Sequence, residues 1–323
     1  MSLAAQWDYT DTVRVRVPAK INLALRVGSR RHDGYHELAT IFQAVSLYDE
    51  VRAEWADSGI ACSVGGTDAH QIGPENENLA FRAAQLLQRE YSVSAGARLT
   101  IDKRIPVAGG MAGGSADAAA ALLACARLWE LEASLDDLME LGSRLGSDVP
   151  FLLMGGCAVG LGRGESLTPM LSRGLYHWVL AFSRQGLSTP AVYRQFDRLA
   201  AQSGPGMTDG GRSVASAPAK PGMPRDLMMA LTAGDVPRVG GFLVNDLQAS
   251  ACSMMPVLST LLRAGRTASC LGAIVSGSGP TIAFLTADEQ AATDLAVSLS
   301  SQGVAHQVRL ATGPVPGASV VEG

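Results

Sequence analysis

The sequence is poor in lysine, in charge and in long apolar runs, and each shortage excludes a class of protein. Of its 26 basic residues only three are lysine, namely Lys20, Lys103 and Lys220. Charged residues make up 17% of the chain and the formal net charge is −4. No overall basic field would therefore attract nucleic acid or anionic lipid, although a local basic site is not excluded. The longest uncharged run, 267–287, is interrupted by Ser-Gly-Ser-Gly-Pro, so it is not a membrane helix.

Cysteine is also sparse. The five cysteines are scattered, with no C-x-x-C pair and no histidine cluster beside them. This pattern is typical of reduced thiols in a cytoplasm rather than of a disulfide framework. No basic and then apolar leader opens the sequence, which favours the same compartment. We therefore expect a cytoplasmic protein with no nucleic-acid or membrane partner.

The first half of the chain alternates between strand and helix patterns. A length of 323 residues with 47% hydrophobic residues suggests two domains or one large one. Alternating apolar residues predict strands at 12–17 and 21–27, separated by Pro18. Asn78 is a good N-cap for a helix at 79–87, a strand follows at 97–105, and the alanine-rich segment 116–131 predicts a helix that is buried on all sides.

The second half continues this mixture of elements. Ser134 and Asp137 resemble a capping box that opens a helix ending near Gly146, and a turn carrying Asp148 follows. Further strands and helices are predicted from the apolar spacing, with strands at 177–182, 271–275 and 281–285 and helices at 190–199, 226–232 and 256–264. Residues 200–224, rich in Gly, Pro, Ser and Ala, predict a flexible loop, and residues from 312 onward predict a frayed tail.

A glycine-rich segment at 109–115 lies between a predicted strand and a predicted helix. Backbone N–H groups in such a loop, together with the positive end of the helix dipole, bind phosphate oxygens. The loop is not a Walker A motif, because Ser115 and Ala116 stand where Lys and Ser/Thr are required, and it lacks the Rossmann order of glycines. A tight corner between strand and helix would use the same glycines, so that alternative stays open.

A triphosphate in this loop would need positive charge from outside it, because phosphoryl transfer depends on electrostatic stabilisation. Mg²⁺ is the expected supplement, and Ser115 is its candidate ligand, with helix capping as the alternative role. Lys20 and Asp148 each lie among apolar residues without a sequence neighbour of opposite charge. Pairing them in space would offset both burial penalties and keep the carboxylate ionised beside a substrate hydroxyl. A purely structural ion pair is the alternative.

Four segments of the sequence resemble the GHMP small-molecule kinases, and the resemblance spans roughly residues 12–310. They are Pro18-Ala19-Lys20-Ile21-Asn22-Leu23 with Asp33-Gly34-Tyr35-His36-Glu37-Leu38, residues 106–119, Gly146-Ser147-Asp148-Val149-Pro150-Phe151, and 276–281. The resemblance implies a two-lobed α+β fold. Its N-terminal lobe (1–165) would resemble domain 2 of ribosomal protein S5, its C-terminal lobe (166–312) would be ferredoxin-like, and a tail (313–323) would follow.

The Asp-Gly-Tyr-His combination at 33–36 distinguishes this sequence from mevalonate, homoserine and galactose kinases. The resemblance then implies ATP-dependent phosphorylation of the C2 hydroxyl of 4-diphosphocytidyl-2-C-methyl-D-erythritol, giving the 2-phosphate and ADP, in the non-mevalonate route to isoprenoid precursors. ATP and Mg²⁺ would be the cofactors, and the protein would be a monomer or weak homodimer. A different GHMP activity and a nucleotide-binding module without catalysis are the two alternatives.

The same resemblance assigns roles to individual residues. Asp148 would act as base or orienting group with Lys20 as its charge partner. The residues expected to bind ATP are Asn78, Leu79, Lys103, Pro106, Gly109, Gly110, Gly113, Gly114 and Ser115. The residues expected to bind the substrate are Asn22, Tyr35, His36, Thr189 and Tyr193. The sequence departs from the family at Met111-Ala112, where Leu-Gly is usual, and at Ala116, where a second serine is common.

Overall fold

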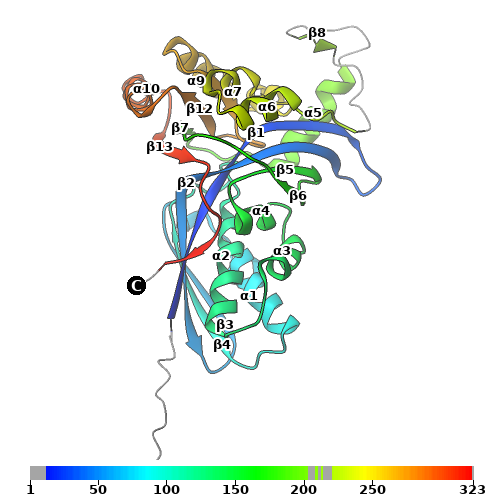
Figure 1. Cartoon of the computed structure of the whole chain (residues 1–323), viewed down its shortest axis with the longest axis vertical. Helices are drawn as coiled ribbons and strands as arrows, with labels where there is room; N and C mark the ends of the chain where they lie inside the picture. The colour runs from blue at the N-terminus through cyan, green and yellow to red at the C-terminus, as the bar shows by residue number, and fades with distance from the viewer. Residues whose placement is uncertain (1–11, 203–207, 210–211, 214–219, 322–323) are drawn as a thin grey trace, which may run out of the picture.

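The chain folds into two lobes that share long strands. The computed structural model describes residues 12–202, 208–209, 212–213 and 220–321. Figure 1 shows the lobe built from the first half of the chain below and the lobe that follows it above, with strands β1 and β2 running from the lower lobe up to the upper one. The arrangement is α+β, as the sequence predicted.

The lower lobe is built on a mixed sheet, in which eight strands pair within the described residues. Its main path runs β10-β1-β2-β4-β3, while β14 pairs with β1, β5 pairs with β2, and β6 pairs with β5. The strands are β1 (Thr12–Arg30), β2 (His36–Ala56), β3 (Ile60–Gly66), β4 (Gly96–Lys103), β5 (Cys157–Gly162), β6 (Ser166–Pro169), β10 (Val244–Asn245) and β14 (Ser319–Val320).

The sequence predicted two strands separated by Pro18, but the structure has one continuous strand, β1. The pairing of β1 with β2 continues past it, with a register shift between Pro18 and Ala19. A proline lacks the N–H that a ladder hydrogen bond needs, and a bulge is a position where a sheet tolerates it. Lys20 follows directly after this irregularity and lies in a stretch of β1 that is buried on both faces.

Helices α1–α4 cover one face of this sheet (Figure 1). They are α1 (Leu79–Glu90), α2 (Gly113–Leu128), α3 (Leu135–Ser143) and α4 (Val149–Met154). Helix α2 is buried along most of its length, which confirms the sequence prediction, and its alanines allow close approach to the neighbouring elements. The side chain of Asn78 caps α1, and the Ser134 capping box of α3 is present. The turn expected at Asp148 is present at 147–148, and Asp148 is the N-cap residue of α4, which follows it.

The upper lobe contains a four-stranded antiparallel sheet in the order β11-β12-β7-β13, as far as the described residues show. Its strands are β7 (Tyr176–Phe182), β11 (Gly272–Val275), β12 (Ile282–Thr286) and β13 (Gln307–Gly313). Its helices are α5 (Thr189–Gln202), α6 (Arg225–Ala233), α7 (Val236–Phe242), α8 (Gln248–Met254), α9 (Val257–Thr267) and α10 (Glu289–Ser301). The strands and helices predicted for this half are therefore present.

Two short strands, β8 (Thr208–Asp209) and β9 (Arg212–Ser213), pair within the segment 200–224 that was predicted as a flexible loop. The residues of that segment at 203–207, 210–211 and 214–219 lie outside the described residues, so the prediction stays open there. None of the helices in the described ranges is both long and apolar enough to cross a membrane.

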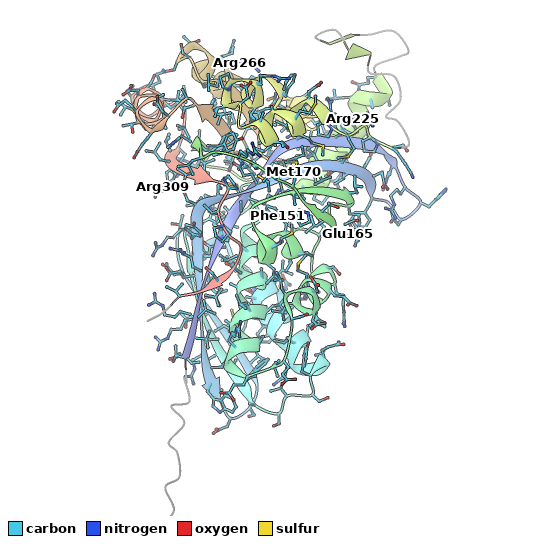
Figure 2. The ribbon with its side chains drawn as sticks, in the orientation of Figure 1. Phe151, Glu165, Met170, Arg225, Arg266 and Arg309 are labelled. Carbon is cyan, nitrogen blue, oxygen red and sulfur yellow. The ribbon has the colours of Figure 1, made fainter. Side chains whose placement is uncertain are left out.

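The two lobes are joined by more than one passage of the chain. The boundary expected between residues 165 and 166 remains a prediction, and the change of sheet itself falls between β6 and β7. Strand β10 returns from the second half of the chain to pair in parallel with β1, at Ala24 and Leu25. Phe151 of α4 points into the shared core, where its ring centroid lies 5.0 Å from that of Phe42 on β2 (Figure 2).

The frayed tail predicted from residue 312 is wrong for the described residues. Gly313 ends β13, and β14 pairs with β1. The Val315 N–H donates to the Ala44 carbonyl at 3.2 Å, and the Val321 N–H donates to the Arg14 carbonyl at 2.8 Å. The segment covers backbone groups of the long strands that would otherwise lack partners, which explains why a sequence rich in glycine and proline is ordered here.

Candidate active site

The glycine-rich loop joins β4 to α2 in a conformation that only some residues tolerate. Ala108, Gly110 and Ala112 have positive φ angles of 53°, 76° and 61°. A Cβ atom on Gly110 would lie 2.4 Å from the Ser276 carbonyl oxygen, so the backbones approach too closely for any side chain. Because α2 begins at Gly113, its first N–H groups have no partner within the helix and can bind an anion.

Both lobes brace this loop. From the lower lobe, the Lys20 N–H donates to the Met111 carbonyl at 3.3 Å. From the upper lobe, the Ser276 hydroxyl donates to the Gly110 carbonyl at 3.1 Å, and the Thr281 N–H donates to the Gly109 carbonyl at 3.2 Å. The carbonyl groups of Gly109, Gly110 and Met111 therefore accept hydrogen bonds from the rest of the protein. This arrangement leaves N–H groups of the loop available to a ligand.

Lys20 and Asp148, which the sequence analysis expected to pair, lie together beside the loop. The Lys20 Nζ is 3.8 Å from the Asp148 Oδ2. The lysine is 5% exposed, whereas the Asp148 side chain is 29% exposed. The carboxylate is thus open to a ligand, while the ammonium is reached only from the site.

Asn22 fixes the position of the ammonium. Lys20 Nζ donates to Asn22 Oδ1 at 2.6 Å, and Asn22 Nδ2 donates to the Thr40 hydroxyl at 2.8 Å. Both ends of the Asn22 amide are therefore engaged within the protein. The sequence analysis assigned Asn22 to the substrate, and the structure shows that its amide holds Lys20. Alternation along β1 placed the two side chains on one face, and this spacing was the signal that could have indicated the contact.

The segment 276–281 of the upper lobe packs against the side chains of Lys20 and Asn22. A Cβ atom on Gly277 would lie 3.2 Å from Asn22 Oδ1 and 3.4 Å from Lys20 Nζ. Asn245 of β10 holds the segment, because its Nδ2 donates to the carbonyls of Val275 and Gly277 at 2.7 Å each. Sequence reasoning missed Asn245, since a short strand after a helix carries no distinctive pattern.

Aromatic side chains of α5 gather around His36. The His36 ring stacks on Tyr193 with centroids 5.1 Å apart and an interplanar angle of 25°, and Phe196 meets it edge-on at 6.0 Å. His36 Nε2 lies 2.8 Å from Asp197 Oδ1. Burial, and then the charge of Asp148, raises the pKa of the Tyr193 hydroxyl, so this ring lies within the electrostatic reach of the carboxylate.

Tyr35 and Thr189 occupy the edges of this aromatic group. Tyr35 is 55% exposed, and the Arg163 guanidinium lies 5.1 Å from its ring centroid. Thr189, at the start of α5, shares a hydrogen bond of 2.8 Å with the Ser278 hydroxyl. This contact connects α5, which carries Tyr193 and Phe196, to the segment 276–281.

Comparisons with known proteins identify this arrangement. The model described as GHMP kinases N terminal domain matches residues 78–156, and the model described as GHMP kinases C terminal matches 227–305. A protein of Mycobacterium tuberculosis is 50% identical over 318 residues, covering 98% of this chain and 96% of the relative. A Rhodococcus jostii protein is 50% identical over 309 residues, covering 96% and 95%. Both relatives are named 4-diphosphocytidyl-2-C-methyl-D-erythritol kinase.

The chain belongs to the GHMP kinase family. It is an ATP-dependent small-molecule kinase with both domains of that family. A crystal structure of 4-(cytidine 5'-diphospho)-2C-methyl-D-erythritol kinase is 32% identical, has a TM-score of 0.72, and covers 92% of this chain and 98% of its own. A homoserine kinase from Cytophaga hutchinsonii has the same TM-score at 17% identity, covers 99% of this chain and 100% of its own, and shows the shared fold alone.

In this GHMP kinase, the residues expected at the nucleotide surround the glycine loop. Asn78 caps α1 through its Oδ1, which accepts the Ala80 N–H at 2.8 Å. The Leu79 Cδ1 lies 3.7 Å from the position of a Cβ on Gly114, and the Pro106 carbonyl oxygen lies 3.2 Å from that of a Cβ on Gly109. Their contacts with ATP remain predictions.

Lys103, which was expected to bind ATP, has a buried side chain that contacts two carboxylates. It is 2% exposed, so its side chain is buried although the residue stands at the end of β4. Its Nζ lies 2.5 Å from Asp49 Oδ2 and 2.7 Å from Asp117 Oδ2. Two carboxylates inside the protein therefore engage the ammonium, and a contact of Lys103 with ATP remains a prediction.

The donor set at the loop fits a magnesium ion that is bound mainly through phosphate. No cluster of three or more His, Cys, Asp or Glu side chains that could hold a metal occurs among the residues described. The Ser115 Oγ lies 3.7 Å from the position of a Cβ on Gly146, two residues before Asp148. Mg²⁺ commonly takes one or two protein ligands together with substrate phosphates and water, and Ser115 and Asp148 suffice for that.

Proposed function

We propose that this GHMP kinase transfers the terminal phosphoryl group of ATP to the C2 hydroxyl of 4-diphosphocytidyl-2-C-methyl-D-erythritol, giving the 2-phosphate and ADP. The names of relatives that are 50% identical over nearly the whole chain support this substrate. The reaction serves the non-mevalonate route to isoprenoid precursors. The observation that carries the proposal is the Lys20 and Asp148 pair. The backbone of Lys20 contacts the glycine-rich loop, and the charge of Asp148 acts on Tyr193 of the aromatic group.

Asp148 orients the substrate hydroxyl and accepts its proton. Its carboxylate is partly open, as a group that must meet a substrate has to be. Lys20 stabilises the negative charge that develops on the reacting oxygen, and Asn22 holds the ammonium so that little reorganisation is needed. The purely structural ion pair considered from the sequence does not account for the exposure of the carboxylate.

The glycine loop binds the phosphates through its backbone. The N–H groups at the start of α2 point to the open side of the loop, because both lobes engage its carbonyls. ATP supplies the phosphoryl group, and Ser115 and Asp148 would hold a Mg²⁺ ion, which would neutralise phosphate charge. Asn78, Leu79 and Pro106 border the nucleotide on the sides described above, together with the backbone of Lys103.

The aromatic group receives the cytidine end of the substrate. Flat rings stack on a pyrimidine face, and an imidazole can hydrogen-bond to its polar edge. His36, Tyr193 and the exposed Tyr35 supply these groups, and Thr189 anchors the start of α5 beside them. The location in the cytoplasm and the monomeric or weakly dimeric state remain predictions.

A coupled assay of ADP release tests the proposal. The full-length protein is given ATP, Mg²⁺ and either the cytidylated methylerythritol or the same compound without its cytidine diphosphate group. We expect turnover with the first compound and about 100-fold less kcat/KM with the second, because the aromatic contacts are lost. Mevalonate and homoserine serve as alternative acceptors, and faster turnover with either would replace the proposed substrate.

The Asp148→Asn and Lys20→Ala variants test the chemistry. Each should lower kcat by about 100-fold or more with the fold intact, as expected for a general base and an electrostatic stabiliser. Glu50→Gln is the matched control, because it removes the 2.9 Å ion pair with Arg14, which also involves β1 but lies outside the site. Near-normal kcat in a folded Asp148→Asn protein would remove the role assigned to this carboxylate.

A further inference from the structure

A buried charge cluster lies directly behind the phosphate loop, and the reaction as derived above does not use it. It consists of Lys103, Asp49 and Asp117, which are 2%, 0% and 3% exposed. The Lys103 Nζ contacts Asp49 Oδ2 at 2.5 Å and Asp117 Oδ2 at 2.7 Å. The three residues come from β4, β2 and α2, so one ammonium joins three elements.

Asp49 attaches the cluster to the beginning of the loop. Its Oδ1 accepts the Arg104 N–H at 2.6 Å and the Ile105 N–H at 2.8 Å. These are the first two residues after β4, which ends at Lys103. The direction in which the chain leaves the strand is therefore set by the carboxylate that also pairs with Lys103.

Asp117 attaches the cluster to the end of the loop. It lies near the start of α2, which begins at Gly113. A Cβ atom on Gly113 would lie 3.2 Å from the Lys103 Nζ, so the ammonium also contacts the point at which the loop becomes helix. Both ends of the segment 104–112 are thus tied to a single positive group.

The charge of the cluster suits a site for phosphate. Burial raises the pKa of Asp117 well above its usual range, with the charge of Lys103 opposing this and that of Asp49 adding to it. The Oδ1 of Asp117 has no hydrogen-bond partner among the described residues. The ammonium of Lys103 offsets negative charge of the two carboxylates, which limits the negative charge behind the N–H groups of the loop.

We propose that Lys103, Asp49 and Asp117 are positioning residues that hold the two ends of the phosphate loop at the spacing needed to bind ATP. The cluster acts from inside the protein, through the backbone of the loop, and Lys103 contributes its side chain here rather than at the adenine. The inference rests on the proposed use of this loop for phosphate binding.

The test compares three variants of the full-length protein. Asp117→Leu removes one of the two acceptors of Lys103, Asp117→Asn keeps an acceptor of the same size at that position, and Trp129→Phe is the control. Trp129 follows α2, and its Nε1 donates to the Gly96 carbonyl at the start of β4, at 3.1 Å. The control therefore loosens the same two elements at their other ends, without touching the loop.

Amide hydrogen exchange of residues 106–115, measured without nucleotide, is the first readout. We expect Asp117→Leu to exchange about 10-fold faster in this segment, and Asp117→Asn and Trp129→Phe to stay within about 3-fold of the parent protein. In the second readout, Asp117→Leu raises the KM for ATP by about 10-fold and leaves the KM of the acceptor within about 2-fold, while Asp117→Asn restores the parent values.

Unchanged exchange in a folded Asp117→Leu protein would overturn the proposal. So would equal changes in Trp129→Phe, or equal increases in both KM values, because these would show a general loss of packing. If Asp117→Leu does not fold, Asp49→Asn takes its place under the same criteria. Failure of the proposed substrate in the turnover assay leaves the exchange measurement intact, so the two outcomes are separable.

Discussion

Replacing Gly277 by alanine tests whether the upper lobe shapes the site around Lys20. Gly277 has a φ of 56°, in the left-handed region that favours glycine. The added methyl group would lie 3.2 Å from Asn22 Oδ1, 3.2 Å from the Gly110 carbonyl oxygen and 3.4 Å from Lys20 Nζ. The substitution therefore places one carbon atom among the polar groups of the proposed site.

Two separate effects follow from this geometry. The backbone strain of an alanine in the left-handed region costs about 1 to 2 kcal/mol of stability. The contacts are shorter than the roughly 3.5 to 4.0 Å of comfortable packing, so Lys20 and Asn22 must move by tenths of an ångström. Because misplacement by about 1 Å can reduce catalysis by about 100-fold, we expect kcat to fall by about 10-fold.

Gly303→Ala separates the two effects. Gly303 has a φ of 62°, close to that of Gly277, but nothing lies within 4 Å of the position of its Cβ. It therefore reproduces the strain without the intrusion. We would measure thermal unfolding and kcat for both variants. A Gly277→Ala protein with the kcat of Gly303→Ala would refute the placement of Gly277 against the reacting groups.

Three further predictions concern the substrate wall, the loop and a buried thiol. Tyr193→Ala should raise the KM of the cytidylated substrate more than that of ATP, and equal effects in steady-state kinetics would argue against stacking. Ala112→Gly should relieve the strain of a φ of 61° and raise stability in urea by about 0.5 to 1 kcal/mol, whereas a loss would show that Ala112 is not strained. Burial raises the pKa of Cys62 from 9.0 to about 12, ahead of the charges of Glu75 and Asp117. Because the pKa is higher in the folded state than in the unfolded state, this contribution to stability is complete below pH 9 and is lost above it. The free energy of unfolding in urea should therefore decrease less between pH 8 and pH 10.5 for Cys62→Ala than for the parent protein.

Local signals were sufficient for most elements of the fold. The Asn78 cap, the Ser134 capping box and the apolar surface of α2 each depend on residues within one or two turns, and the structure contains all three. The pairing of Lys20 with Asp148 could also be inferred, because each is a charged residue among apolar neighbours that needs a partner of opposite charge. These features could be predicted from the sequence.

Features that depend on distant partners could not be predicted. Asp49 is 54 positions from Lys103, and His36 is 161 positions from Asp197. A lysine at the end of a strand ordinarily points to water, and only the two carboxylates from other elements make its burial favourable. The prediction of a frayed C-terminal tail was wrong for the same reason. That segment is ordered by hydrogen bonds with backbone groups of β1 and β2, and its own composition does not show this.

The geometry around Lys20 depends on the upper lobe even though Lys20 and Asp148 both belong to the lower one. Strand β10 pairs with β1 at Ala24 and Leu25, a few residues beyond Lys20. Asn245 at the end of β10 then holds the backbone on both sides of Ser276, whose hydroxyl in turn donates to the phosphate loop. One short strand thus connects the strand that carries the ammonium, the segment that covers it and the loop that binds phosphate. The first half of the chain carries both reacting groups and the amide that holds the ammonium, and the second half packs a backbone segment against them.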